Sequence, residues 1–450
     1  MTSLSVTDVS KKNSDADTPS PLDMLSSRRP FIRRGDDTLD SNQLLCHAGA
    51  LAASLPPRPA ALNLCERREN FLVAFLALLM RGQACLMPPS RAPAVLAEVM
   101  QENPGCYRLD DTTVAQSHVE VGAQCEMPDI PPGRIVAIGY TSGSTGRPKA
   151  NPKTWGSFAA STRLNCARLR DIVARSHHGA LPWIVATIPS QHMYGMEMSV
   201  LMPLLGGMGI HGDCPFYPAD ICAALQDLPE PGVLVTTPVH LRTLVQSGIN
   251  LPPIAAVVSA TAPLAQDLAQ AVERRFDTTV LEFFGSTETC VIASRLTARE
   301  TTWRPYSGVT LLPYDEWTRV SAPWLPQDVL LQDVVRIGTD GCFVISGRNI
   351  DMVEVAGKRA SLADLTRRLL SVPGVSDGVV FQPGFGSGEV VKRLAALVVA
   401  EGLTEARLTA MLATSMDPVF LPRPLVFVSK LPRNEVGKLP LDRLLAALQR

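Results

Sequence analysis

The sequence predicts an α/β fold: a large N-terminal domain of mainly parallel sheets with flanking helices, and a small α+β C-terminal domain. A chain of 450 residues is too long for one ordinary hydrophobic core and should divide into two or more units. Between residues 232 and 286, apolar strand patterns alternate with helical patterns, an order typical of parallel sheets. After residue 374, shorter strand and helix patterns alternate, which predicts the small domain.

The N-terminal region opens with a polar segment and continues as a strand–helix–strand unit. Residues 1–26 are rich in Ser, Asp and Lys and lack periodic apolar positions, so we predict a disordered tail. A helical pattern begins at Asp40, and residues 61–93 have the pattern of a strand, a helix and a strand. The apolar run FLVAFLALLM within this unit is too short to span a bilayer and predicts a buried helix.

Composition favours a globular protein and argues against several classes of partner. Apolar residues make up 46% of the chain and the net charge is −1, which excludes a strongly basic nucleic-acid surface or a polybasic membrane patch. The ten Cys residues form no CxxC pair and no secretory segment opens the chain, so we expect reduced thiols and a cytoplasmic location. We expect neither a nucleic-acid partner nor a membrane span.

The stretch YTSGSTGRPKA, residues 140–150, has the composition of a phosphate-binding loop. It follows the apolar run IVAIGY, which predicts a buried strand ending at the loop. Glycines let backbone N–H groups turn toward one centre, hydroxyls add donors without bulk, and a Lys adds positive charge. The pattern GxxxxGK[ST] is not met, because Arg147 follows Gly146, and GxGxxG is absent. The residues expected to bind phosphate are Thr141, Ser142, Gly143, Ser144, Thr145, Gly146 and Lys149.

Other candidate residues follow predicted strands further along the chain. A helix over residues 155–174 precedes the strand in PWIVATIPSQHMYGM, and a helix over residues 196–205 follows it. Two more strands end in the turns SATAPL and FFGSTETC, at the carboxyl edge where ligands of parallel sheets gather. In the second turn, the ring of Phe284 can stack on adenine, and Glu288 is a hard oxygen ligand suited to Mg²⁺.

These motifs, and the order in which they occur, resemble those of the adenylate-forming enzymes. This family includes acyl- and aryl-CoA synthetases, luciferase-like enzymes and peptide-synthetase adenylation domains. The family signature Tyr-Thr-Ser-Gly-Ser-Thr-Gly-x-Pro-Lys matches residues 140–149, and aromatic-Gly-x-Thr-Glu matches residues 284–288. A strand with an embedded Asp, a Gly-Arg pair at residues 347–348 and Leu-Pro-x-x-x-x-Gly-Lys at residues 431–438 follow. The resemblance therefore covers most of the chain.

The resemblance implies a role for each matching residue. The implied catalytic residues are Lys438, Glu288 and Thr287, and Glu288 is also the implied Mg²⁺ ligand. The implied ATP-binding residues outside the phosphate loop are Phe284, Gly285, Asp333 and Arg348. A His-x-x-Gly turn marks the mouth of the acid pocket in relatives, and the implied pocket residues are His192, Tyr194, Gly195, Ser259 and Ala260. Gly357 would lie on the path of the thiol.

The same resemblance implies how the two domains are divided and how they move. A nucleotide- and acid-binding domain would cover residues 27–346, and a small mobile domain, residues 347–450, would rotate between two reaction steps. The chain departs from the family at the hinge, where Ile350 stands in place of the usual Asp. Either Asn349 or Asp351 would then serve as the hinge residue.

The implied function is an ATP- and Mg²⁺-dependent ligase that converts a carboxylic acid to an acyl-adenylate and passes it to a thiol. The thiol is either coenzyme A or the phosphopantetheine arm of an acyl carrier protein. The segment SQHMYGMEM lacks the Asp that pairs with an amino-acid ammonium, and burying an unpaired ammonium is costly. We therefore expect an acid without an α-amine, with an aryl acid such as a hydroxybenzoate first and a fatty acid second.

Two further expectations concern the role of the protein. By analogy alone, the compact chain suits a stand-alone ligase of bacterial secondary metabolism. The alternative is a nucleotide-binding scaffold that has lost catalysis, for which Ile350 is the support. The presence of Lys149, Glu288, Asp333 and Lys438 favours the enzyme.

Overall fold

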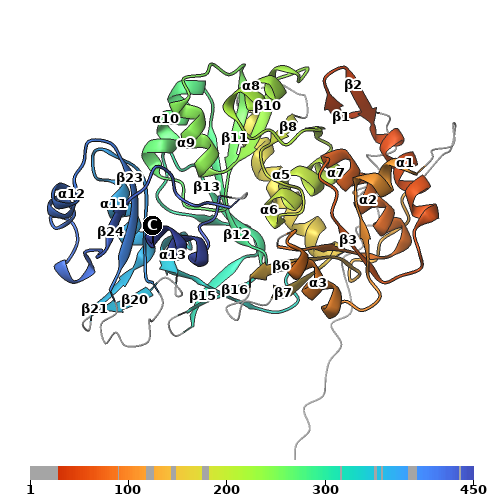
Figure 1. The fold of residues 1–450 in the computed structure, drawn as a ribbon. Coiled ribbons are helices and arrows are strands. Elements are labelled where there is room, and N and C mark those ends of the chain that lie inside the picture. The colour runs from red at the N-terminus through yellow and green to blue at the C-terminus, as the bar shows by residue number, and fades with distance from the viewer. Residues whose placement is uncertain are drawn as a thin grey trace, which may run out of the picture.

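The computed structural model describes ten segments of the chain (Figure 1). They are residues 29–89, 91–117, 126–142, 148–174, 182–314, 317–348, 352–355, 358–383, 393–434 and 437–449. The predicted tail at residues 1–26 lies outside them.

A nine-stranded sheet is the largest element of the fold, in the order β14-β13-β12-β11-β10-β8-β9-β1-β2. Its six central strands, from β12 to β1, run parallel, and antiparallel strands close both edges. Every residue of β10 and β11 is buried, as expected for strands covered on both faces. The strands are β1 (Pro30–Arg34), β2 (Asp37–Asp40), β8 (Trp183–Ala186), β9 (Gly209–His211), β10 (Gly232–Thr236), β11 (Ile254–Ser259), β12 (Val280–Ser286), β13 (Cys290–Arg295) and β14 (Arg304–Pro305).

A second sheet of five strands has the order β5-β3-β4-β6-β7. The pairs β3–β4, β3–β5 and β4–β6 are parallel, whereas β6 and β7 form an antiparallel pair around the predicted phosphate loop. The strands are β3 (Ala60–Asn63), β4 (Ala84–Met87), β5 (Tyr107–Leu109), β6 (Ile135–Ser142) and β7 (Pro148–Thr154). Both large sheets are therefore mainly parallel, and the predicted fold class is confirmed.

Helices flank these sheets, and side-chain caps fix several of their starts. Asp40 forms a capping box with Gln43, and Thr154 and Thr237 cap the helices that follow them. The helices are α1 (Ser41–Ser54), α2 (Arg68–Arg81), α3 (Pro93–Glu102), α4 (Asp111–Ala115), α5 (Trp155–Val173), α8 (Pro218–Gln226), α9 (Pro238–Gln246) and α10 (Gln266–Phe276). None of the helices in the described segments has both the length and the apolarity needed to cross a bilayer.

Helix α2 is the predicted core helix and also fixes the segment before His192. Its residues from Phe71 to Leu79 are buried. At its start, the fully buried Arg68 donates to Ser190 Oγ at 3.1 Å and to the carbonyl of Ala186 at 3.0 Å. Because a buried guanidinium requires partners, this side chain ties the end of β8 to α2.

The helix predicted over residues 196–205 is longer and irregular. It consists of α6 (Met193–Gly195), the π-helix η2 (Met196–Leu201) and α7 (Met202–Gly206). Pro203 lacks the N–H that an α-helical turn needs there, which accounts for wider turns just before it. The helix ends at Gly207, whose φ of +73° favours glycine.

The remaining elements build smaller sheets. They are β15 (Thr310–Tyr314), β16 (Trp317–Ser321), β17 (Val329–Leu331), β18 (Asp333–Ile337), β19 (Phe343–Arg348), β20 (Met352–Val355), β21 (Lys358–Ser361), α11 (Leu362–Leu370), β22 (Val375–Phe381), β23 (Ala395–Ala400), α12 (Glu405–Leu412), η4 (Pro418–Phe420), β24 (Leu425–Phe427) and α13 (Leu441–Leu448). Strands β22, β23 and β24 form one sheet with its own buried residues, drawn from residues 353–444. In Figure 1 these C-terminal elements, in blue, lie on the side of α9 and α10. The domain boundary at residues 346–347 stays a prediction.

Candidate functional site

The candidate site lies where the five-stranded and nine-stranded sheets meet. From β7, Lys153 Nζ donates to the backbone carbonyl of Glu288 at 2.7 Å, and Lys153 is only 5% exposed. From β6, Thr141 Oγ1 lies 3.5 Å from Glu288 Oε1. Thr141 and Lys149 are cross-strand neighbours, and the Lys149 side chain is exposed. Three of the predicted residues are thus brought together at this seam.

A close approach at Gly139 allows the two sheets to meet. A Cβ atom at Gly139 would lie 2.7 Å from Met193 Cε and 3.0 Å from Thr287 Cγ2. The β6 backbone therefore packs directly against Thr287 and against α6. A side chain at this position would push Thr287 and Met193 away from β6.

The turn that carries Glu288 is irregular and held from several sides. A bulge shifts the register between Phe284 and Gly285, and a Cβ at Gly285 would lie 2.1 Å from the carbonyl oxygen of Cys290. Cys290 has a φ of +59°, in the left-handed region. Trp324 Nε1 donates to the carbonyl of Thr289 at 2.9 Å. The turn is thereby fixed by partners distant in sequence.

Glu197 is a buried acid behind this turn. Its Oε1 accepts hydrogen bonds from Val291 N at 3.0 Å and from Ser161 Oγ at 3.1 Å. Burial raises the pKa of the Glu197 carboxyl to about 6, although the hydrogen bond from Val291 and the positive charge of Lys153 oppose the rise. Glu197 lies in the π-helix η2, so its placement depends on the irregular helix.

The predicted adenine-binding ring, Phe284, is half-buried against two aromatic neighbours. Its centroid lies 5.3 Å from that of Trp303 and 5.6 Å from that of Phe343. Arg295 lies over Trp303 at 4.4 Å and forms an ion pair with Glu282 at 2.7 Å. These contacts fix the plane of Phe284.

Asp333 and Arg348, predicted to bind the nucleotide, are cross-strand partners in the β18–β19 pair. The same strand β19 carries Phe343, which packs on Phe284. The predicted ribose-binding and adenine-binding positions are therefore connected through β19.

His192 and Lys438 come together although they are far apart in sequence. Burial of the ring, reinforced by the positive charge of Lys438, lowers the pKa of the His192 imidazole to about 4. Within the segments that the structure describes, His192 Nδ1 has no hydrogen-bond partner. A shielded nitrogen of this kind is available to a bound molecule.

Tyr194 and Ser259 lie deeper, at the carboxyl ends of β10 and β11. The Tyr194 hydroxyl lies 3.3 Å from the carbonyl of Thr236 and 3.2 Å from that of Val258. It therefore donates to backbone carbonyls at the ends of β10 and β11. Ser259 is fully buried, and its hydroxyl has no partner among the described residues. Gly195 is required because a Cβ there would lie 1.9 Å from the Pro189 carbonyl oxygen.

Several predicted residues cannot be placed in this geometry. Gly143, Ser144, Thr145, Gly146, Asn349, Ile350, Asp351 and Gly357 lie outside the described residues. Ser142 and Arg348 end β6 and β19, and their roles stay predictions. Ala260 follows β11 and is buried.

The sequence did not predict the buried residues that hold the Glu288 turn in place. Lys153 stands in NPKTW and Glu197 in MEMSV, strings that match no motif. A weak signal existed for Gly139, since a Gly inside a strand pattern often marks a close backbone approach.

Comparison with known proteins gives a family match over this region. The family model described as AMP-binding enzyme matches residues 90–320. The chain is 28% identical over 309 residues to the 4-coumarate–CoA ligase of Rhodobacter capsulatus, covering 67% of this chain and 74% of that protein. It is 25% identical over 378 residues to the 3-hydroxybenzoate–CoA/4-hydroxybenzoate–CoA ligase of Thauera aromatica, covering 73% and 69%.

Solved structures share the fold over nearly the whole chain. The o-succinylbenzoate-CoA synthetase of Bacillus subtilis, in complex with the acyl-adenylate OSB-AMP, has a TM-score of 0.79 at 17% identity and covers 94% of this chain and 97% of that one. ATP-bound MatB of Rhodopseudomonas palustris has a TM-score of 0.74 at 19% identity, covering 94% and 96%. At these identities the likeness establishes the fold.

The buried Glu197 carboxyl predicts a specific pH dependence of stability. Its pKa of about 6 in the folded state exceeds the ordinary 4.5, so the folded protein binds this proton more tightly than the unfolded chain. The stabilisation is complete below pH 4.5 and is lost as the pH rises through 6. Replacing Glu197→Gln keeps an acceptor for Val291 and removes this loss, which corresponds to about 2 kcal/mol.

Urea unfolding of wild type and variant at a series of pH values measures the difference. Glu401→Gln, at an exposed position, is the matched control and should follow the wild-type profile. An identical pH profile for Glu197→Gln and wild type would show that the Glu197 proton is not held more tightly in the fold.

Proposed function

The chain belongs to the AMP-binding enzyme family of acid–thiol ligases, and we propose that it activates an aryl carboxylic acid, such as a hydroxybenzoate, with ATP and passes the aryl group to a thiol. One observation carries the proposal. Thr141 and Glu288 meet at the seam of the two sheets, while Lys438 of the C-terminal region lies close enough to His192 to influence its pKa. The site thus contains the hydroxyl of Thr141, the carboxylate of Glu288 and the ammonium of Lys438.

In the proposed first step, a carboxylate oxygen of the acid attacks the α-phosphorus of ATP and pyrophosphate leaves. The product is an aryl-adenylate. Thr141 and Lys149 would bind the leaving phosphates, and Thr287 would donate to the α-phosphate. Lys438 would stabilise the negative charge that develops between the carboxylate and the α-phosphate.

Glu288 suits Mg²⁺ because it offers a carboxylate with a hydroxyl 3.5 Å away, a hard oxygen set. The described residues contain no group of three or more His, Cys, Asp or Glu able to hold a metal ion. Phosphate oxygens and water would therefore supply the remaining ligands. When bound, Mg²⁺ neutralises charge on the phosphates.

In the second proposed step, a thiol attacks the carbonyl carbon of the adenylate, a thioester forms and AMP leaves. The acceptor is either coenzyme A or a carrier-protein phosphopantetheine. Gly357 remains the proposed neighbour of the thiol path.

Buried side chains near Tyr194 support the proposed substrate class. Glu197 is buried, and its Oε1 already accepts from Val291 and Ser161, so this acid does not suit a substrate ammonium. Met193 and Met196 are buried and apolar. The curated relatives named above are ligases of 4-coumarate and hydroxybenzoates, which supports an aryl acid over a fatty acid.

The test is acid-dependent pyrophosphate release by the purified protein with ATP and Mg²⁺. The panel should include 4-hydroxybenzoate, 3-hydroxybenzoate, 4-coumarate, octanoate and phenylalanine. We expect the aryl acids to give the highest kcat/KM. Preference for octanoate would instead support the fatty-acid alternative, and release with none of a broad set of acids would support the inactive scaffold.

Glu288→Gln is expected to lower the rate of adenylate formation by about 100-fold or more, because the amide keeps the shape but loses the charge that binds Mg²⁺. Pyrophosphate release at a series of Mg²⁺ concentrations measures the effect, and excess Mg²⁺ should restore part of it. Glu230→Gln, an exposed glutamate between α8 and β10, is the control. Wild-type activity of Glu288→Gln at ordinary Mg²⁺ would remove Glu288 from the site.

Lys438→Ala is expected to separate the two steps. Loss of the ammonium should slow adenylate formation by about 100-fold, equivalent to about 3 kcal/mol. Conversion of a supplied synthetic adenylate to thioester should persist, because that step begins after the charge has been dispersed. The rates with ATP plus acid, and separately with adenylate plus thiol, are compared with those of Lys430→Ala, an exposed lysine immediately before the string LPRNEVGK. Equal loss of both steps in a folded variant would contradict this role.

A further inference from the structure

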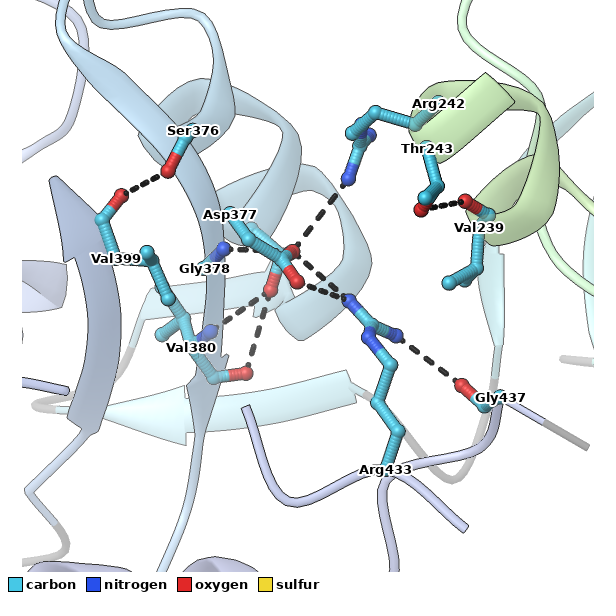
Figure 2. Close-up of polar contacts among 11 residues, drawn as sticks. Val239, Arg242, Thr243, Ser376, Asp377, Gly378, Val380, Val399, Arg433 and Gly437 are labelled. Atoms are coloured by element: carbon cyan, nitrogen blue, oxygen red, sulfur yellow. Dashed lines mark hydrogen bonds and ion pairs between the residues drawn. The ribbon is translucent and has the colours of Figure 1, made fainter. Parts of the chain in front are cut away.

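The loop that carries Lys438 is held by an ion pair within the C-terminal region (Figure 2). Arg433 Nη2 donates to both carboxylate oxygens of Asp377, at 2.8 and 2.9 Å. Arg433 Nη1 donates to the carbonyl of Gly437 at 3.1 Å, immediately before Lys438. Because the planar guanidinium binds Asp377 and Gly437 through different nitrogens, it ties the loop to strand β22.

The backbone of Lys438 is itself fixed within the loop. Asn434 Oδ1 accepts from Lys438 N at 2.8 Å, and Asn434 N donates to the Lys438 carbonyl at 2.8 Å. Gly437 has a φ of +77°, so the turn needs glycine at this point. The loop therefore moves as a unit with Arg433 and Asp377.

The same carboxylate reaches across to the large domain. Arg242 Nη1, on α9, lies 3.5 Å from Asp377 Oδ1. Val239, one turn earlier on α9, lies beside Gly437, where an added Cβ would be 3.5 Å from Val239 Cγ2. Residues three apart share one helix face, so α9 presents Val239 to the loop and Arg242 to the carboxylate that holds the loop.

The contact across the domains is weaker than the contact within one. Arg242 is 31% exposed and Asp377 24%, and the single 3.5 Å approach contrasts with two hydrogen bonds from Arg433. A partly exposed pair of this kind adds modest stability and weakens with salt. It can bias an orientation of the domains without locking it.

We propose that Arg242 is a positioning residue for adenylate formation: its ion pair with Asp377 holds the Lys438 loop against α9. This inference rests on the function proposed above. Arg242 acts through Asp377 and Arg433 on the orientation of Lys438, and the first step depends on that orientation more than the second.

The test compares half-reactions in Arg242→Gln. Adenylate formation from ATP and acid should fall about fivefold in kcat, and thioester formation from supplied adenylate should keep its wild-type rate. Arg242→Lys should recover part of the loss. Arg407→Gln, an exposed position on α12, is the matched control and should change neither step.

Two further measurements separate positioning from a general structural effect. Added NaCl should slow adenylate formation by wild type more than by Arg242→Gln, because the variant has no pair to screen. In a double-mutant cycle, Arg242→Gln should cost little in an Asp377→Asn background, since the charged partner of Arg242 is already absent there. Hydrogen–deuterium exchange of residues 437–444 should rise in Arg242→Gln and not in Arg407→Gln.

The outcomes distinguish a failure of this inference from a failure of the proposed function. If wild type releases pyrophosphate and Arg242→Gln matches it, with unchanged exchange, Arg242 does not position the loop. Equal loss in both half-reactions would also overturn the inference, because it would indicate a structural role. If wild type activates no acid, the proposed function fails and the inference falls with it.

Discussion

The hydrogen bond from Lys153 Nζ to the carbonyl of Glu288 is the interaction on which the site depends, because it joins β7 of one sheet to the β12–β13 turn of the other. Its donor is a buried ammonium, and Glu197 lies near enough for the charge of Lys153 to influence its pKa. Loss of the ammonium would leave a buried carboxylate poorly compensated and a carbonyl without its partner, a costly combination. The position of Glu288 relative to Thr141 therefore follows from the hydrogen bond of a buried ammonium rather than from the turn alone.

Much of this arrangement could be predicted from local sequence. Strings such as IVAIGY and TTVLEFF encode buried strands, and the Gly-rich strings after them encode where the strands end. Strands β6 and β12 form as predicted but run two residues past these strings, to Ser142 and Ser286. Lys153 and Glu197 could not be found in this way, since a charged residue in a string predicts exposure. Only tertiary contacts, with Val291 and Ser161 for Glu197, make their burial tolerable.

The contacts of the C-terminal region show the same limit more strongly. The motif LPRNEVGK indicates a loop with Lys438 after Gly437, and Lys438 does lie between β24 and α13. Asp377 and Arg433 are 56 residues apart, and Arg242 lies on α9, much earlier in the chain. Hydrophobic periodicity cannot predict ion pairs between residues so far apart. Taken alone, each arginine is predicted to be a solvated surface residue. The irregular helix from Met193 to Gly206 was likewise predicted as regular, because Pro203 acts on the turns before it.

The charges around His192 connect the sheet region of the site to the C-terminal region. The low pKa of His192 means that its imidazole is neutral at pH 7. The positive charge that acts on it belongs to Lys438, which is carried by the C-terminal region. The loop of Lys438 is held in turn by Arg433, Asp377 and Arg242. The electrostatic potential at His192 therefore depends on contacts made by three residues that lie far from it in the sequence.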